Sequence, residues 1–210
     1  MNKKQLLVSL VALLLPAGAA AQYVIYPVPQ EQVAGTDKVN FTSTVTLVCE
    51  EGIDAYTVNR AKQVLTEAGL KVETANEPSA NQSNELVGVK GSKGVADAKA
   101  EALGLKMDVF GLANKYARHL LSLSDGGNGR AAMLILGENT DAAFFGFASL
   151  EQMFDAGTQA MAVTTLYDYA DQKSRGLVAG YYGYPNTVEV KKDLMRFMMR
   201  HKKNNYMYGA

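Results

Sequence analysis

The chain has no tryptophan, one cysteine and only two histidines among its 210 residues. A single cysteine excludes a framework of internal disulfides. His119 and His201 lie far apart in the sequence and outside any H-E-x-x-H pattern, which argues against a zinc site. Acidic and basic residues balance at 21 each, so the chain lacks the basic surplus that a nucleic-acid partner would require. We therefore expect neither a metal site nor a nucleic-acid partner.

The longest apolar run lies at the N-terminus. Two lysines at positions 3 and 4 precede the apolar stretch Leu6–Leu15, and three alanines end at Ala21 before Gln22. This is the pattern of a bacterial signal peptide, and the run is shorter than the ~20 residues that span a bilayer. We expect residues 1–21 to be removed by cleavage near Ala21–Gln22. The mature protein would then be exported, periplasmic or extracellular, with no membrane span. The alternative is a buried N-terminal helix.

The lone cysteine, Cys49, ends a segment in which apolar residues alternate with asparagine and threonine. That alternation over residues 39–49 predicts one strand with a buried face. Neither histidine is close to Cys49 in the sequence, so we interpret it as a small buried hydrophobic residue and not as a nucleophile.

Helix signals and strand signals then alternate up to residue 160. Asp54 is expected to cap a helix that ends at Gly69, and Asp141 to cap a later helix. The turn-rich segment Asp125–Gly129 between two apolar runs predicts a hairpin. Residues 22–160 are therefore expected to form an α+β, or mixed α/β, domain.

Further expected elements are a strand at 71–74, a loop at 77–84, a strand at 86–89, helical or irregular segments at 95–103 and 107–113, and an extended exit segment at 164–169. Residues 161–174 are assigned to a linker.

Three sets of residues are candidates for chemical sites. The segment GVKGSKG, Gly88–Gly94, lacks the spacing of phosphate-binding loops and is interpreted as a turn. The candidate carboxylates are interpreted as surface charges or helix caps; they are Glu50, Glu51, Asp168, Asp171 and Asp193. His201 and its basic neighbours are interpreted as a solvated helix end.

Residues 175–210 have the pattern of one βαβ unit. The apolar run Gly176–Tyr182 predicts a strand buried on both faces, and Asn205–Tyr208 predicts a second strand. Between them lies an amphipathic helix whose apolar stripe is Val190, Leu194, Phe197 and Met198. Ordering about 35 residues costs on the order of 50 kcal/mol, which so small a unit cannot offset by burial. We therefore expect these strands to belong to a larger sheet.

RGLVAGYYGYP from Arg175, the basic helix and NNYMYGA together resemble the start of the barrel of glycoside hydrolase family 84. Ala179, Tyr181 and Asn186 depart from that family, which has Glu, Phe and Trp there. YPVPQ near the mature N-terminus, and the segment from Leu120 through Phe144-Phe145-Gly146 and Gln152, resemble the accessory domain found in families 84 and 20.

The resemblance implies an accessory domain of the hexosaminidase domain-2 type, followed over residues 175–210 by the truncated start of a TIM (β/α)₈ barrel. It implies a retaining β-N-acetylglucosaminidase in which the substrate's acetamido oxygen attacks the anomeric carbon. The partners would be glycans or glycoproteins containing N-acetylglucosamine, and no cofactor is implied. Gly180 and Tyr182 are the expected sugar-contacting residues. The catalytic aspartate pair is expected in sequence beyond residue 210, so residues 1–210 alone should be inactive.

Two other interpretations remain open. The chain could be a non-catalytic carbohydrate-binding or scaffolding protein. It could also be related to family 20 β-hexosaminidases, although the R-G-x-x-x-G-x-Y-G pattern disfavours that family.

Overall fold

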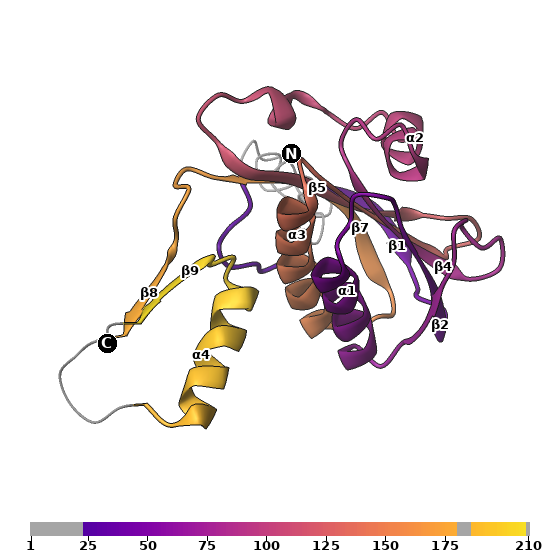
Figure 1. Ribbon diagram of the computed structural model, residues 1–210. Helices are drawn as coiled ribbons and strands as arrows, with labels where there is room; N and C mark the ends of the chain where they lie inside the picture. The colour runs from indigo at the N-terminus through magenta and orange to yellow at the C-terminus, as the bar shows by residue number, and fades with distance from the viewer. Residues whose placement is uncertain (1–22, 180–185, 209–210) are drawn as a thin grey trace, which may run out of the picture.

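The computed structural model describes residues 23–179 and 186–208 (Figure 1). Seven strands form one mixed sheet in the order β1-β7-β5-β6-β4-β2-β3. Their bounds are β1 Glu31–Val39, β2 Thr44–Cys49, β3 Lys71–Thr74, β4 Ser83–Val89, β5 Tyr116–Asp125, β6 Ala131–Gly137 and β7 Met161–Ala170. The helices are α1 Ala55–Glu67, α2 Val95–Ala102, α3 Thr140–Met153 and α4 Val188–Arg200, with 3₁₀ turns at Asp108–Gly111 and Phe154–Ala156. Strands β8, Gly176–Ala179, and β9, Asn205–Tyr208, form a second sheet.

Helices cover both faces of the large sheet. α1 and α3 lie side by side on one face, and α2 lies on the other (Figure 1). The larger apolar core lies under α1 and α3 and includes Leu47, Leu121 and Phe147. The smaller core, with Leu120 and Leu134, lies under α2. The expected α+β domain is thus confirmed.

One half of the sheet is parallel and the other half is antiparallel. β6, β4, β2 and β3 run parallel, whereas β1, β7, β5 and β6 are joined by antiparallel pairs. The predicted hairpin is confirmed as β5–β6. Its turn has positive φ angles at Gly127, Asn128 and Gly129, and the Asp125 carboxylate accepts a hydrogen bond from the Gly127 amide at 2.7 Å.

The helix caps agree with the sequence in one helix and differ in another. Asp54 caps α1 by accepting from the Thr57 amide at 2.8 Å, and Gly69 follows that helix with φ 83°. The prediction for α3 was wrong, because Asn139 and not Asp141 is its N-cap. The Asn139 side chain accepts from the Ala142 amide at 2.9 Å, and Asp141 lies in the first turn.

Residues 39–49 do not form a single strand. β1 ends at Val39 and β2 begins at Thr44, because the intervening chain bonds elsewhere. The Thr42 amide donates to the Ser83 hydroxyl at 3.0 Å, and the Ser83 amide donates to the Thr42 hydroxyl at 2.8 Å. β1 itself was not predicted, because it is a largely exposed edge strand without an apolar face.

The segment expected as an exit and linker is part of the large sheet. β7 pairs with β1 on one side and with β5 on the other. The first domain therefore extends to Ala170, ten residues further than the sequence pattern suggested.

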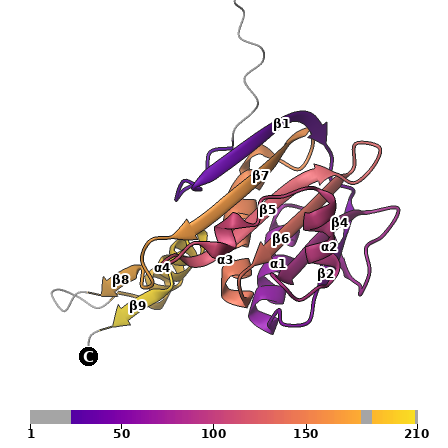
Figure 2. The same cartoon turned by 90° about the horizontal axis from the view of Figure 1, so that it is seen from above.

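The C-terminal segment forms a βαβ unit beyond the carboxyl end of β7 (Figure 2). β8 and β9 are parallel, with Gly176 opposite Asn205 and Ala179 opposite Tyr208. The expected burial on both faces was wrong for the described part of β8, since Val178 is 69% exposed. On α4, Met198 is buried, whereas Val190 and Phe197 of the same predicted stripe are exposed. No described helix combines the length and apolarity needed to cross a bilayer.

Candidate functional site

The two expected sugar-contacting residues, Gly180 and Tyr182, lie outside the described residues. The described chain reaches Ala179, the last residue of β8. The structure describes the hydrogen bonds that fix the start of β8.

Three side chains join the beginnings of β8 and β9. The Asn204 side chain accepts from the Arg175 amide and donates to the Lys173 carbonyl, both at 2.8 Å. The Asn205 side chain donates to the Ser174 hydroxyl at 2.7 Å. A Cβ at Gly176 would overlap the Asn205 carbonyl. Arg175-Gly176 and Asn204-Asn205 therefore have a structural role, because they join the beginnings of β8 and β9.

A cleft of about 280 Å³ separates this unit from the large sheet. It is lined by the N-terminal segment, by β5, α3 and β7, by the chain that leads into β8, and by the turn between α4 and β9. Its polar lining residues include His119, Asp168, Arg175, His201 and Lys202. Both histidines of the chain line it, although 82 positions of sequence separate them. A cleft with converging buried polar groups is the usual place to look for a functional site.

A buried ion pair forms the wall of this cleft. The Lys202 ammonium donates to Asp168 Oδ2 at 2.5 Å, and the two residues are 6% and 5% exposed. Lysine and aspartate are rarely this buried unless they are paired. This finding corrects two predictions: Asp168 is not a surface charge, and the helix end at Lys202 is not solvated.

His119 lies beside the pair and is neutral. Its Nδ1 lies 2.7 Å from the Ala117 carbonyl, which only accepts, so Nδ1 bears the hydrogen and Nε2 bears the lone pair. Nε2 is buried without a hydrogen-bond partner and lies 3.8 Å from Asp168 Oδ2. Burial lowers the pKa of His119 to about 4, and the positive charge of Lys202 contributes.

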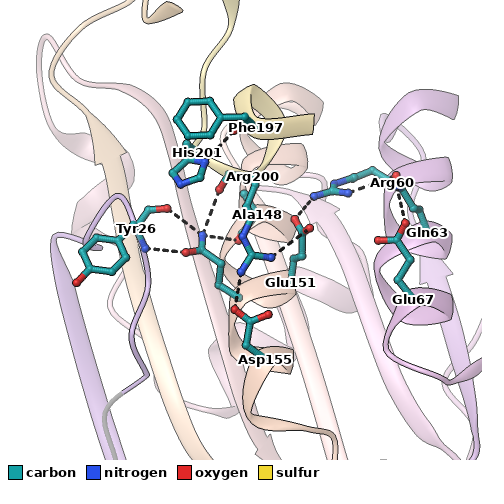
Figure 3. A network of polar contacts seen from close by, with 11 residues as sticks. Tyr26, Arg60, Gln63, Glu67, Ala148, Glu151, Asp155, Phe197, Arg200 and His201 are labelled. Atoms are coloured by element: carbon teal, nitrogen blue, oxygen red, sulfur yellow. Dashed lines mark hydrogen bonds and ion pairs between the residues drawn. The ribbon is translucent and has the colours of Figure 1, made fainter. Parts of the chain in front are cut away.

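A polar network joins α3 to the last turn of α4 (Figure 3). The Gln152 amide oxygen accepts from the Tyr26 amide at 2.8 Å, and its nitrogen donates to the Arg200 carbonyl at 3.1 Å. The Arg200 guanidinium contacts Asp155 at 2.5 Å and Glu151 at 3.4 Å. Gln152, which the resemblance singled out, therefore links the N-terminal segment, α3 and α4.

The remaining candidate carboxylates have the roles that were expected. Glu51 is exposed. Asp171 and Asp193 are also exposed, and they pair with Lys115 and Arg196. Glu50 accepts from the Ala96 amide at 2.6 Å and so caps the N-terminal end of α2.

The glycine-rich segment is a turn, as predicted. Asp97 accepts from the Gly91 amide at 2.9 Å and from the Lys93 amide at 2.8 Å. Because these amides and that of Ala96 already bind carboxylates, they do not face an open anion site.

Cys49 is half-buried and packs against the larger apolar core, so it is less buried than the sequence suggested. Burial raises the pKa of its thiol to about 12, and the nearby carboxyl of Glu85 adds to the effect. Since the thiolate is the reactive form, this cysteine is a poor nucleophile. Glu85 is fully buried on β4 with neither carboxyl oxygen hydrogen-bonded, and burial raises its pKa well above the ordinary value.

The sequence did not reveal the cluster of His119, Asp168 and Lys202. These residues come from β5, β7 and the turn after α4, and no local motif links them. The one available signal was a lysine two positions after the last helical residue, where chains often use glycine.

One protein family and several solved structures are similar to this chain. The family described as "Glycosyl hydrolase family 20, domain 2" matches residues 22–113. The solved structure of CpGH84D is 33% identical with a TM-score of 0.80; the match covers 90% of this chain and 30% of CpGH84D. CpGH84B is 21% identical with a TM-score of 0.70, again over 90% of this chain and 30% of CpGH84B.

A more distant relative has the same fold. An inactive mutant of a family 20 exo-β-N-acetylglucosaminidase from Vibrio harveyi is 11% identical with a TM-score of 0.63, over 90% of this chain and 26% of that one. The chain thus spans less than a third of each of these structures. The seven-stranded fold and these matches agree: the chain is related to glycosidases and has an N-terminal domain of the glycoside hydrolase family 84 and family 20 type.

Proposed function

We propose that this chain is the N-terminal part of a β-N-acetylglucosaminidase of the family 84 type. The observation that carries the proposal is the parallel β8–α4–β9 unit that follows the accessory domain. The match to CpGH84D covers 90% of the chain, so it extends past the seven-stranded sheet into this unit.

The unpaired strand edges and exposed apolar residues of the C-terminal unit support its assignment as the beginning of a barrel. Within the described chain, β8 and β9 pair only with each other, so each has an outer edge without a partner strand. Val178 and Met207 are 69% and 57% exposed on these strands. Open edges and exposed apolar residues call for neighbouring strands and a covering layer. A (β/α)₈ barrel would supply both.

The proposed division of the chain combines these features with the sequence pattern of residues 1–21. Residues 1–21 are a signal peptide, residues 22–170 are the accessory domain, and a short connection leads into the barrel segment that begins at Arg175. The protein is exported, and its partners are glycans or glycoproteins that end in N-acetylglucosamine.

The proposed chemistry is substrate-assisted hydrolysis with retention. Gly180 and Tyr182 follow β8 in the sequence, at the end of a barrel strand where such active sites lie. No described carboxylate lies at the carboxyl end of β8 or β9. The acid and its partner aspartate would come from later strands.

Family 84 is preferred over family 20 for the whole protein. The identity to CpGH84D is 33%, against 11% to the Vibrio harveyi family 20 enzyme. The retained Arg175-Gly176 start of β8 supports the same choice.

The test uses p-nitrophenyl N-acetylglucosaminide as substrate. The purified 210-residue chain should give no turnover above a blank. The reading frame beyond codon 210 should encode two adjacent aspartates, and the protein extended through the whole barrel should hydrolyse the substrate. Changing either aspartate to asparagine should abolish that activity. Turnover by the 210-residue chain, or an inactive extended protein with both aspartates intact, would contradict the proposal.

Export has its own test. The mature protein recovered outside the cytoplasm should begin at Gln22 when its N-terminus is sequenced.

A further inference from the structure

The turn between α4 and β9 ends its helix with an unusual residue. The Lys203 amide donates to the Met198 carbonyl at 2.9 Å, and the Lys202 amide donates to the Met199 carbonyl at 3.4 Å. This is the Schellman arrangement, in which the residue after the C-cap adopts a left-handed conformation. That residue is Lys202, with φ 54°.

Two other helices of the same chain end in the same way but with glycine. Gly69 follows α1 with φ 83°, and Gly104 follows α2 with φ 62°. Both have the same pair of backbone hydrogen bonds. Glycine is favoured there because a Cβ destabilises the left-handed conformation. The chain therefore accepts a left-handed conformation at Lys202 that glycine would adopt without strain.

The side chain of Lys202 forms a buried ion pair with β7. Its ammonium is buried and donates to Asp168 at 2.5 Å. Asp168 lies on β7, which pairs with β1 and β5 on its two sides. The pair thus attaches the end of α4 to an interior strand of the large sheet.

The backbone of Lys202 connects the ion pair to the start of β8. The Lys202 carbonyl accepts from Arg175 Nε at 3.0 Å. The Arg175 guanidinium also lies over the Phe145 ring of α3, 5.2 Å from its centroid. Since β8 begins at the next residue, Gly176, the direction of β8 depends on where Arg175 is held.

Apolar packing contributes little to this attachment. Met198 is the buried residue of α4, whereas Val190 and Phe197 are exposed. The side of the unit that meets α3 is held by polar groups, among them Arg200 and Gln152 (Figure 3). Each of these contacts requires particular donor and acceptor positions, and in some proteins buried ionic groups specify one arrangement of neighbouring elements.

We propose that Asp168 and Lys202 are positioning residues: through their buried ion pair and Arg175, the accessory domain sets the direction of β8, the strand that leads to Gly180. The inference rests on the proposed function for what β8 presents to a substrate. The positioning itself is a property of this chain and does not require hydrolase activity.

The test compares Lys202→Gly and Asp168→Asn with the unchanged 210-residue chain. The control is Lys115→Met, which removes an exposed ion pair with Asp171 beside the same cleft. Amide hydrogen exchange within 176–179 and 205–208 should accelerate at least tenfold in both variants. Exchange in β5 and β6 should be unchanged, and the control should match the unchanged chain.

A second measurement reports orientation directly. Spin labels at Val178→Cys and Glu77→Cys, both exposed positions, are introduced with Cys49→Ser. The distance distribution between them should be narrow in the unchanged chain and in the Lys115→Met background, and at least twice as wide with Lys202→Gly.

Lys202→Gly makes the test decisive because it also relieves the left-handed strain. If only the turn conformation mattered, glycine would leave exchange unchanged or slow it, and the distances would stay narrow. That result would overturn the proposal. Faster exchange throughout β5 and β6 would also overturn it, since the pair would then stabilise the whole domain without a positioning role. Neither hydrogen exchange nor the spin-label distance depends on turnover. The positioning proposal is therefore tested separately from the hydrolase assignment.

Discussion

Among single residues, Glu85 on β4 lies in an environment that disfavours its charged form. Its carboxyl is fully buried with no hydrogen-bond partner, and its pKa is raised well above 4.5. In the unfolded chain the same group ionises above about pH 4.5. Between pH 4.5 and the higher pKa of the folded state, folding therefore protonates Glu85, and stability is lost as the pH rises through that range.

Glu85→Gln removes this proton uptake. We expect the free energy of unfolding of the variant to rise relative to that of the unchanged chain. The difference should grow by about 1.4 kcal/mol per pH unit above pH 4.5, until the pKa of the folded state is reached. Urea unfolding at pH 5, 6, 7 and 8 measures the difference. Glu77→Gln, at an exposed position, should show none. A difference that stays constant with pH would mean that Glu85 is ionised in the folded protein.

His119 has the opposite pH dependence. Its pKa is lowered to about 4 from 6.5, so the unfolded chain takes up a proton first as the pH falls. Stability should therefore decrease between about pH 6.5 and pH 4, by on the order of 3 kcal/mol in total.

His119→Gln should abolish that decrease. The comparison is cleanest in the Glu85→Gln background, where the opposing slope is absent. His201→Gln serves as the control and should retain the decrease. If the slope persists in the His119 variant, another group titrates in that range.

At the scale of secondary-structure elements, α3 offers a direct test of helix capping. Asn139 accepts from the Ala142 amide, whereas Asp141 lies exposed in the first turn. Asn139→Ala should lower the free energy of unfolding by about 1 kcal/mol. Asp141→Asn should lower it by about 0.5 kcal/mol or less, through the helix dipole alone. Urea unfolding at pH 7 distinguishes the two, and equal losses would contradict the assigned cap.

The same helix shows why the sequence misplaced its cap. Asn139 and Asp141 are both good capping residues, and they are two positions apart. The choice depends on where β6 ends and how the chain enters the helix, which is settled by packing on the sheet.

At the scale of the whole molecule, the two apolar cores lie entirely within the first domain. Their buried members extend from Ile25 to Tyr167, and none comes from the described part of the C-terminal unit. We expect residues 22–172 to fold and unfold cooperatively on their own. The peptide 173–210 should show no cooperative transition, since ordering it costs on the order of 50 kcal/mol. Circular dichroism during urea titration of both pieces tests this. A cooperative transition in the peptide would mean that the βαβ unit is self-sufficient.

Truncation should also weaken the first domain. Asp168 and Gln152 lose Lys202 and the Arg200 carbonyl, their partners across the junction. The midpoint of urea unfolding should therefore be lower for residues 22–172 than for the full chain.

Features that depend on neighbouring residues could be predicted from the amino-acid sequence alone. These are the hairpin at Asp125–Gly129, the helix from Asp54 to Gly69, the amphipathic helix after Thr187 and the short strand at Asn205. Turn residues, caps and apolar periodicity act over a few positions, so they are visible in one chain. The resemblance to family 84 also came from local motifs.

Contacts between residues far apart in the sequence became visible only in the folded chain. Folding placed β7 inside the sheet, paired Asp168 with Lys202 and left Glu85 without a partner. Each of these depends on which strands become neighbours and on how much water remains beside a side chain. Burial and pairing set the energy of a charge, and neither is encoded within a few residues of it.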